Sequence, residues 1–154
     1  MTPPPTMKQH KNTYFGMILY PDNSIHMGLL KYIESIDYMC PCIWIRHEGE
    51  DEEKKEHIHL MYKAPQASTA ASELKFFAGQ IQHIEPINNP YHYSLYMIHG
   101  TPESMGKKQY SISDIHGNSK LLQKIFGKNQ LLRNLEQCID IAVNNDGIIF
   151  NMAN

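Results

Sequence analysis

Two histidines separated by one residue, His57 and His59 in the stretch HIHLMYK, are the most distinctive chemical feature of this chain. Alternate side chains of a β-strand project from the same face, so both imidazoles would share one face while Ile58 and Leu60 enter the core. Their Cα atoms would lie about 6 to 7 Å apart, which lets two ring nitrogens bind one ion at about 2 Å. Two solvated histidines would give the same pattern, so the pair alone leaves metal binding open.

A third histidine, His47, lies in the segment RHEGE at the end of the preceding apolar run. If the two runs pair as an antiparallel hairpin, His47 and an acidic residue, Glu50 or Glu48, come close to the histidine pair. Three imidazoles and a carboxylate suit Mn²⁺, Mg²⁺, Zn²⁺ or Fe²⁺, and the sequence does not choose among these ions. We therefore expect a divalent metal site built from the three histidines and one of the two glutamates.

Tyrosines provide a second kind of reactive group in the stretch YHYSLYMIH, residues 91–99, which reads as a helix carrying Tyr91, Tyr93 and Tyr96. Aromatic residues at helical spacing are usually core residues. A tyrosine next to a metal-bound phosphate, however, can act as a nucleophile, since covalent attack divides one difficult displacement into two easier ones. The stretch therefore offers candidate nucleophiles for a phosphate bound at the metal site.

Helices and strands that would position these residues can be read from the apolar spacing. The predicted strands are residues 14–20, 38–47, 56–63 and 81–87, and the predicted helices between them are residues 22–36 and 69–81. The order β-α-β-β-α-β is that of the ferredoxin-like split βαβ fold, an α+β arrangement whose helices cover one face of an antiparallel sheet. The active site would then lie on the other, free face.

Composition narrows the class of protein. With 154 residues, 42% hydrophobic and 19% charged, the chain is expected to form one globular domain. A net charge of −2 excludes a protein that coats nucleic acid through an excess of positive charge. Six acidic residues and two lysines in residues 48–56 read as a solvated loop. No segment approaches the ~20 apolar residues of a membrane span, so we expect a cytoplasmic protein that does not act at a membrane.

Taken in order, RHEGE, EHIHLMYK and YSLYMIHGTPESMGKKQYSISDI resemble the successive motifs of the rolling-circle plasmid replication initiator (Rep) proteins of the HUH endonuclease superfamily. Members carry an H-x-x-acid element, then H-x-H followed by a hydrophobic run that ends in Tyr. A helix with Y-L/M-x-H and a stretch with lysine and tyrosine follow. The resemblance runs from about Tyr14 to Ile115, roughly two thirds of the chain.

The resemblance implies metal ligands at His47, Glu50, His57 and His59, with Mn²⁺ or Mg²⁺ as the cofactor, and a single nucleophile at Tyr96. It implies a sequence-specific nickase that attacks one strand of a replication origin. The enzyme would become linked to the 5′ phosphate and leave a 3′ hydroxyl for a polymerase. The family favours Asp at the position of Glu50, and the extra methylene of glutamate changes the reach of this ligand.

Partners follow from the same resemblance. They are origin DNA, single-stranded or in a hairpin at the nick, the host replication machinery, and further copies of the chain. Lys63, Lys75, Lys107 and Lys108 are candidates for contacts with DNA phosphates, although lysines on a solvated face commonly serve only solubility.

Three segments are expected along the chain. Residues 1–12 would be a flexible Pro-rich N-terminus, and residues 13–128 the endonuclease and origin-binding domain. Residues 129–154 would form a C-terminal helix that packs on this domain or leads to an oligomerisation domain.

Other functions remain open at this stage. A metal oxygenase or hydrolase using His47, His57 and a carboxylate would need a small-molecule pocket, and Tyr96 would only pack. A DNA-binding module of the same fold that cuts nothing would need neither the ligands nor the tyrosine. Conjugative relaxases are closer in chemistry, but they usually place their tyrosine before the histidines, whereas Tyr96 follows them.

Overall fold

The computed structural model describes residues 10–49 and 55–127. Its strands and helices are, in order, β1 Asn12–Leu19, α1 Ser24–Ser35, β2 Cys42–His47, β3 His57–Ser68, α2 Ala70–Phe76, β4 Glu85–Ile87, α3 Pro90–Met97 and β5 His116–Gly117. A further helix occupies residues 119–127. The predicted order β-α-β-β-α-β is confirmed by the first six elements. Residues 1–9 of the expected N-terminal segment 1–12, and the whole expected segment 129–154, lie outside the described residues, and β1 already begins at Asn12.

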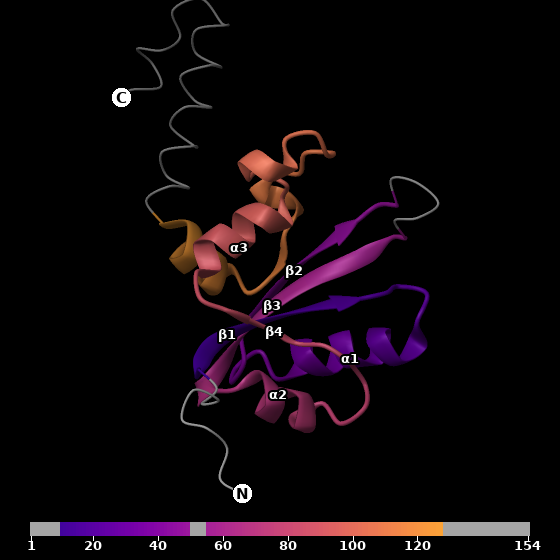
Figure 1. Ribbon diagram of the computed structural model, residues 1–154, viewed down its shortest axis with the longest axis vertical. Helices are drawn as coiled ribbons and strands as arrows, with labels where there is room; N and C mark the ends of the chain where they lie inside the picture. Colours follow the sequence, from indigo (N-terminus) through magenta and orange to yellow (C-terminus); the bar gives the residue numbers. More distant parts are fainter. Residues whose placement is uncertain (1–9, 50–54, 128–154) are drawn as a thin grey trace, which may run out of the picture.

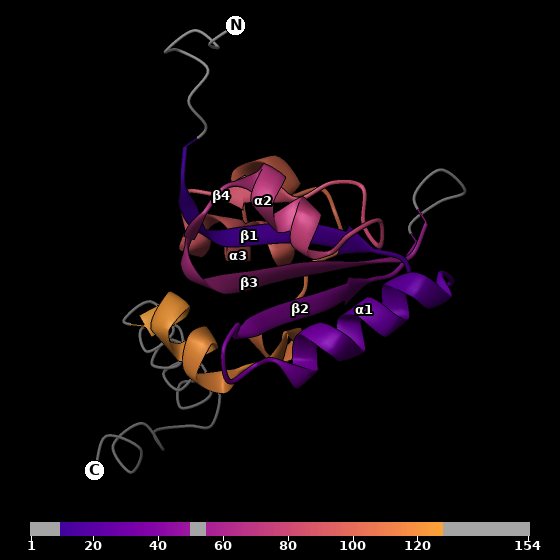
Figure 2. The same ribbon diagram turned by 90° about the horizontal axis from the view of Figure 1, so that it is seen from below.

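The five strands form one sheet with the order β4-β1-β3-β2-β5, and every neighbouring pair is antiparallel (Figure 2). β3 lies in the middle of this sheet and pairs with β1 on one side and β2 on the other. The predicted ferredoxin-like split βαβ arrangement is thus confirmed, with the two-residue strand β5 added at the edge of β2. As a result, the histidine pair lies on a central strand.

One face of the sheet is covered by α1 and α2 (Figure 1). Ile58, Leu60 and Tyr62 of β3 point into this first core and are almost fully buried. The Tyr62 hydroxyl also donates a hydrogen bond to Glu73 of α2 at 2.6 Å, which ties that helix to the sheet. Burying each such side chain contributes about 1.5–3 kcal/mol. Ile58 and Leu60, which alternate with His57 and His59 along the strand, therefore point into the core as predicted.

The opposite face carries a second core beneath α3 (Figure 1). Ile43, Ile45 and Met61 supply its sheet side, and Met97 and Phe126 are among the side chains that cover it. The face expected to be free is therefore largely covered, because the strands present apolar side chains on both of their faces. The histidines lie on this second face, where the apolar residues give way to polar ones.

Helix α3 has defined ends. Asn89 Oδ1 accepts a hydrogen bond from the His92 amide at 3.0 Å, and Pro90 occupies the first helical position, where its missing N–H costs nothing. The helix ends at Met97, two residues before the predicted end, because His99 adopts a left-handed backbone with φ of 59°.

None of the helices in the described residues has the length and the apolar character that crossing a bilayer requires.

Candidate active site

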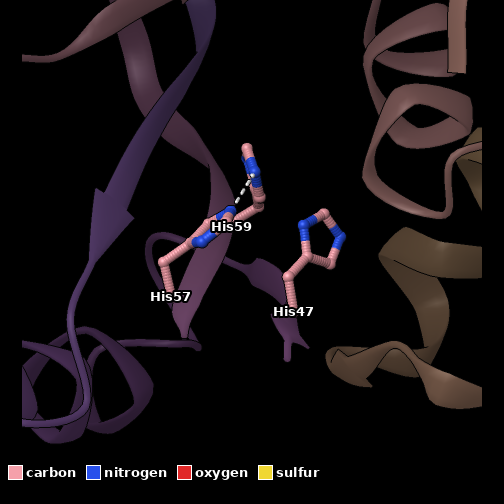
Figure 3. A group of neighbouring side chains, drawn as sticks. All are labelled: His47, His57 and His59. Carbon is pink, nitrogen blue, oxygen red and sulfur yellow. Dashed lines mark hydrogen bonds between the residues drawn. The ribbon is translucent and has the colours of Figure 1, made fainter. Parts of the chain in front are cut away.

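Three imidazoles meet where β2 ends and β3 begins. His47 and His57 are direct partners in the antiparallel register, and His59 follows two residues later on the same face. Figure 3 shows the three rings grouped above the sheet, with His57 and His59 from one strand and His47 from its neighbour. One ligand nitrogen from each lies within 4.8 Å of the others. The hairpin predicted from the sequence therefore brings these three residues together.

Hydrogen bonds set the orientation of His57. Its Nδ1 lies 2.8 Å from the Lys55 carbonyl oxygen, which can only accept, so Nδ1 carries the proton. Nε2 then offers a lone pair and lies 3.1 Å from Nε2 of His59. A metal-binding histidine commonly donates its second nitrogen in this way, since the bond fixes the ring and its tautomer.

His47 is fixed by α3 and by a tyrosine from the segment that follows it. Its Nε2 lies 2.5 Å from the Met97 carbonyl oxygen and donates to it, so Nδ1 is the nitrogen with a lone pair to offer. The ring of Tyr110 stacks on His47 with the centroids 5.0 Å apart and the planes at 16°. Because His47 is only 2% exposed, this imidazole is held by its packing as well as by its hydrogen bond.

His59 is kept in its neutral form. Burial, together with the neighbouring imidazoles and Lys107, lowers the pKa of His59 to about 3. Its Nδ1 is buried and has no hydrogen-bond partner among the described residues, whereas its Nε2 faces Nε2 of His57 and is the nitrogen placed for an ion. Neutral imidazole is the form that binds metal ions.

These residues fit a divalent metal ion. An ion bound at about 2.0–2.1 Å by imidazole nitrogens holds adjacent ligand atoms about 3 to 3.4 Å apart. The distance of 3.1 Å between the Nε2 atoms of His57 and His59 matches this spacing. The ligand nitrogens of all three histidines lie within 4.8 Å of one another, so small side-chain rotations would bring all three to this spacing. Glu50, the predicted acidic ligand, lies outside the described residues. Glu48 lines a small cavity together with the three histidines, and its carboxylate forms an ion pair with Lys108 at 2.7 Å.

Tyr96 lies beside the imidazoles on the exposed side of α3. Its ring meets His59 edge to face, with centroids 5.9 Å apart and an angle of 84° between the planes. The side chain is 39% exposed, and the Lys107 ammonium lies 5.8 Å from the ring centroid. Tyr96 is therefore open to solvent at a point where the protein also supplies a positive charge.

The two other tyrosines of α3 have different surroundings. Tyr91 packs edge to face on Phe126 at 6.0 Å, in the second core. Tyr93 lies over Gly16 of β1, where a Cβ atom would come within 2.6 Å of its hydroxyl oxygen. Burial, with the charge of Glu85 and the neighbouring Tyr96, raises the pKa of Tyr93. Neither lines the cavity that the histidines and Tyr96 form.

That cavity has a volume of about 60 Å³. The residues that line it are His47, Glu48, His57, His59, Tyr96, His99 and Lys107. It has room for an ion with one or two waters, given about 30 Å³ for each water in the liquid. The cavity thus brings together three imidazoles that could hold a metal ion, a tyrosine hydroxyl group and a cation.

Sequence reasoning missed two residues here, His99 and Tyr110. His99 Nδ1 donates to the Lys108 carbonyl at 2.7 Å, and its ring lies 4.3 Å from that of His47. Tyr110 Oη accepts a hydrogen bond from the Glu48 amide at 3.1 Å. The signal for His99 was its position three residues after Tyr96, which placed it near the same face of the helix.

The four lysines proposed for DNA contacts lie in different places. Lys107 lines the cavity, and Lys108 is next to it in the ion pair with Glu48. Lys63 lies further along β3, where the nearby Lys124 lowers the pKa of Lys63. Lys75 lies on α2, on the other face of the sheet.

Comparison with known proteins adds no relative. No protein-family model matches the chain, and no curated protein matches it in sequence. Functional inference for this chain therefore depends on its own residues and on the geometry of this site.

Proposed function

We propose that this protein is a metal-dependent, sequence-specific DNA nickase that initiates rolling-circle replication. The observation that carries the proposal is the position of Tyr96, a solvent-exposed hydroxyl nucleophile whose ring lies 5.9 Å from that of His59 in a cluster of three imidazoles. A site of this kind suits phosphoryl transfer, in which the nucleophile and the charge-stabilising groups must converge on one phosphate.

In the proposed reaction, Tyr96 attacks a phosphodiester of one DNA strand. A bond forms between the phenolic oxygen and phosphorus while the bond from phosphorus to the 3′ oxygen breaks. The phenol gives its proton to solvent, and the departing 3′ oxygen takes one up. The products are a 5′-phosphotyrosine link and a free 3′ hydroxyl that a polymerase can extend.

Other residues of the site have supporting roles in this proposal. A divalent ion held by His47, His57 and His59, with an acidic residue, would polarise the phosphate and stabilise negative charge in the transition state. Lys107 would offset the charge of the phosphate from the side of Tyr96, 5.8 Å from its ring. The Met97 carbonyl holds His47, so the helix that carries the nucleophile also orients a ligand.

The competing functions fit the geometry less well. A small-molecule metalloenzyme would need its ligands to line a pocket of about 300–1,000 Å³, whereas the cavity that the histidines line is about 60 Å³ and none of the three lines the larger cavity beside it. A DNA-binding module that cuts nothing would have no use for an exposed tyrosine beside three clustered imidazoles. We propose that the substrates are replication origins of the plasmid type.

A test for covalent attachment separates these functions. The protein is incubated with Mn²⁺ and either pooled supercoiled plasmids or a pool of random single-stranded oligonucleotides, and the products are run on a denaturing gel. We expect a protein–DNA adduct that survives denaturation and maps to Tyr96 by peptide mass analysis. An adduct on Tyr93, or no adduct with any DNA, would refute the proposal.

A further inference from the structure

A second and much larger cavity of about 570 Å³ lies between the end of β1, the start of α1 and the segment that leads into β4. β4 pairs only with Tyr14, Phe15 and Gly16 of β1, so in the described part of the chain β1 has no strand neighbour on this side beyond Gly16. The volume falls within the range of about 300–1,000 Å³ that is usual for ligand sites.

This cavity lies at the uncovered edge of β1 and reaches the face of the sheet that carries the histidines. Ile18 lines the cavity and is the direct antiparallel partner of His59. Tyr93 also lines the cavity, and its ring centroid lies 6.4 Å from that of Tyr96. The ring of Tyr93 therefore lies between Tyr96 and the cavity, so a strand bound at Tyr96 passes close to the cavity.

Size separates the roles of the two cavities. The histidine cavity, at about 60 Å³, has room for an ion and water but not for the sugar and base attached to a phosphate. A nucleotide next to the scissile phosphate must therefore place its base elsewhere. The 570 Å³ cavity is the neighbouring space that is large enough.

The chemistry of the lining favours a base over a phosphate. Among the described residues no lysine or arginine lines the larger cavity, whereas Lys107 lines the smaller one. The larger cavity presents the amide of Gln82, the carboxylate of Glu85 and the imidazole of His26, along with aromatic and aliphatic surface. Amides and carboxylates form hydrogen bonds with the edges of bases, and a carboxylate accepts from exocyclic amino groups but repels a phosphate.

An exposed aromatic surface stands at the rim. Tyr20 is 38% exposed and stacks on His26, with centroids 5.9 Å apart and planes at 28°. The Tyr20 amide donates to His26 Nδ1 at 3.0 Å, so the pair is held in place. Exposed aromatic rings of this kind are platforms on which unpaired bases stack.

We propose that this cavity binds a nucleobase of the DNA strand, one that flanks the scissile phosphate, and so contributes to the choice of cleavage site. The inference rests on the proposed nickase activity, because the position of the strand is set by Tyr96. Tyr20 provides stacking, and Glu85 and Gln82 read the edge of the base. The histidine site holds the phosphate, and the larger cavity selects the sequence.

The test compares Tyr20→Ala and Glu85→Gln with the parent protein, using a pool of random single-stranded oligonucleotides and Mn²⁺. Strands trapped as covalent adducts are sequenced, and affinity for the preferred strand is measured by fluorescence anisotropy in a Tyr96→Phe background. Tyr20→Ala should weaken binding about tenfold, as expected for one lost stacking contact. Glu85→Gln should change the base preferred next to the cut, because a carboxylate only accepts hydrogen bonds whereas an amide also donates.

Tyr38→Ala is the matched control, since Tyr38 is an exposed tyrosine (85%) that does not line the cavity. It should leave both affinity and base preference unchanged, and thermal unfolding confirms that all variants fold. If the parent forms adducts while Tyr20→Ala and Glu85→Gln keep its affinity and preference, the base-binding role is overturned and the nickase proposal stands. If the parent forms no adduct with any strand, the nickase proposal fails and this inference fails with it.

Discussion

The ring of Tyr96 lies edge-on to the imidazole of His59, with the two centroids 5.9 Å apart, although the residues come from a helix and a central strand 37 positions apart in the chain. The two residues belong to different elements, so their contact depends on how α3 packs on the sheet. The second core brings α3 onto the sheet and so places Tyr96 beside the three clustered imidazoles. This relationship leads to four predictions.

Replacing Tyr96 by Phe removes only the hydroxyl group. We expect nicking and the covalent adduct to disappear while Mn²⁺ binding and the thermal midpoint stay at the parent values, because the ring keeps its contact with His59. Gel assays of nicking and calorimetry measure both properties. Tyr91→Phe is the control and should stay within about tenfold of the parent rate, roughly 1.4 kcal/mol in barrier, since Tyr91 packs in the core against Phe126. Full activity of Tyr96→Phe would contradict the assignment.

Replacing His57 or His59 by Ala removes one ligand of the cluster. Each change should abolish cleavage and weaken Mn²⁺ binding by at least about tenfold, because the loss of one of few ligands opens the site. Isothermal calorimetry gives the affinity, and His10→Ala, at an exposed histidine far from the cluster in sequence, serves as the control. Parent-like Mn²⁺ binding by both variants would show that these strands do not form the metal site.

Acid should destabilise the metal-free protein through His59. The pKa of this imidazole is lowered to about 3 in the folded chain, against about 6.5 in an unfolded one. Between these values the unfolded state binds a proton that the folded state does not, so the free energy of unfolding falls as the pH drops from about 6.5 toward 3. Urea unfolding in chelator should show a smaller fall for His59→Gln than for the parent and for His10→Gln. Equal slopes in all three proteins would count against a neutral, buried His59.

Removing the charge of Lys107 should weaken binding to single-stranded DNA. In a Tyr96→Phe background that prevents cleavage, Lys107→Gln should lower affinity and reduce the slope of log affinity against log salt by about 0.7, as for one phosphate contact. Lys31→Gln, on α1 at the other face of the sheet, is the control and should keep the parent slope. A salt dependence that is identical in the two variants would remove Lys107 from the phosphate-binding site.

The central fold could be predicted because its signals are local. Ile58 and Leu60 alternate with the histidines, which specified both the strand and the face on which the imidazoles lie. The antiparallel pairing of β2 with β3 followed from their apolar runs and the short connection between them. The positions of His47, His57 and His59 therefore came from period-two patterning and this pairing. A strand has few alternatives once one of its faces must be buried.

The rest of the site depended on contacts that have no local signal. His99 and Tyr110 come from irregular backbone after α3, and their places are set by the left-handed turn at His99 and by hydrogen bonds to distant residues. The covering of the second face was underestimated because Met61, like Ile43 and Ile45, presents apolar surface on the side that carries the histidines. The larger cavity arises where the short pairing of β4 leaves the end of β1 uncovered.

The two cores on opposite faces of the sheet divide the molecule into two layers, which should differ in how readily they open locally. The first core joins α1 and α2 to the strands, whereas α3 is held to the sheet through the second core. Local opening of α3 exposes only second-core side chains, so its backbone amides should exchange with deuterium sooner than those at the centre of β3. Tyr96 and the histidines of β3 would then belong to separate opening units, and a strand of DNA bound across them would join the two units and slow that exchange.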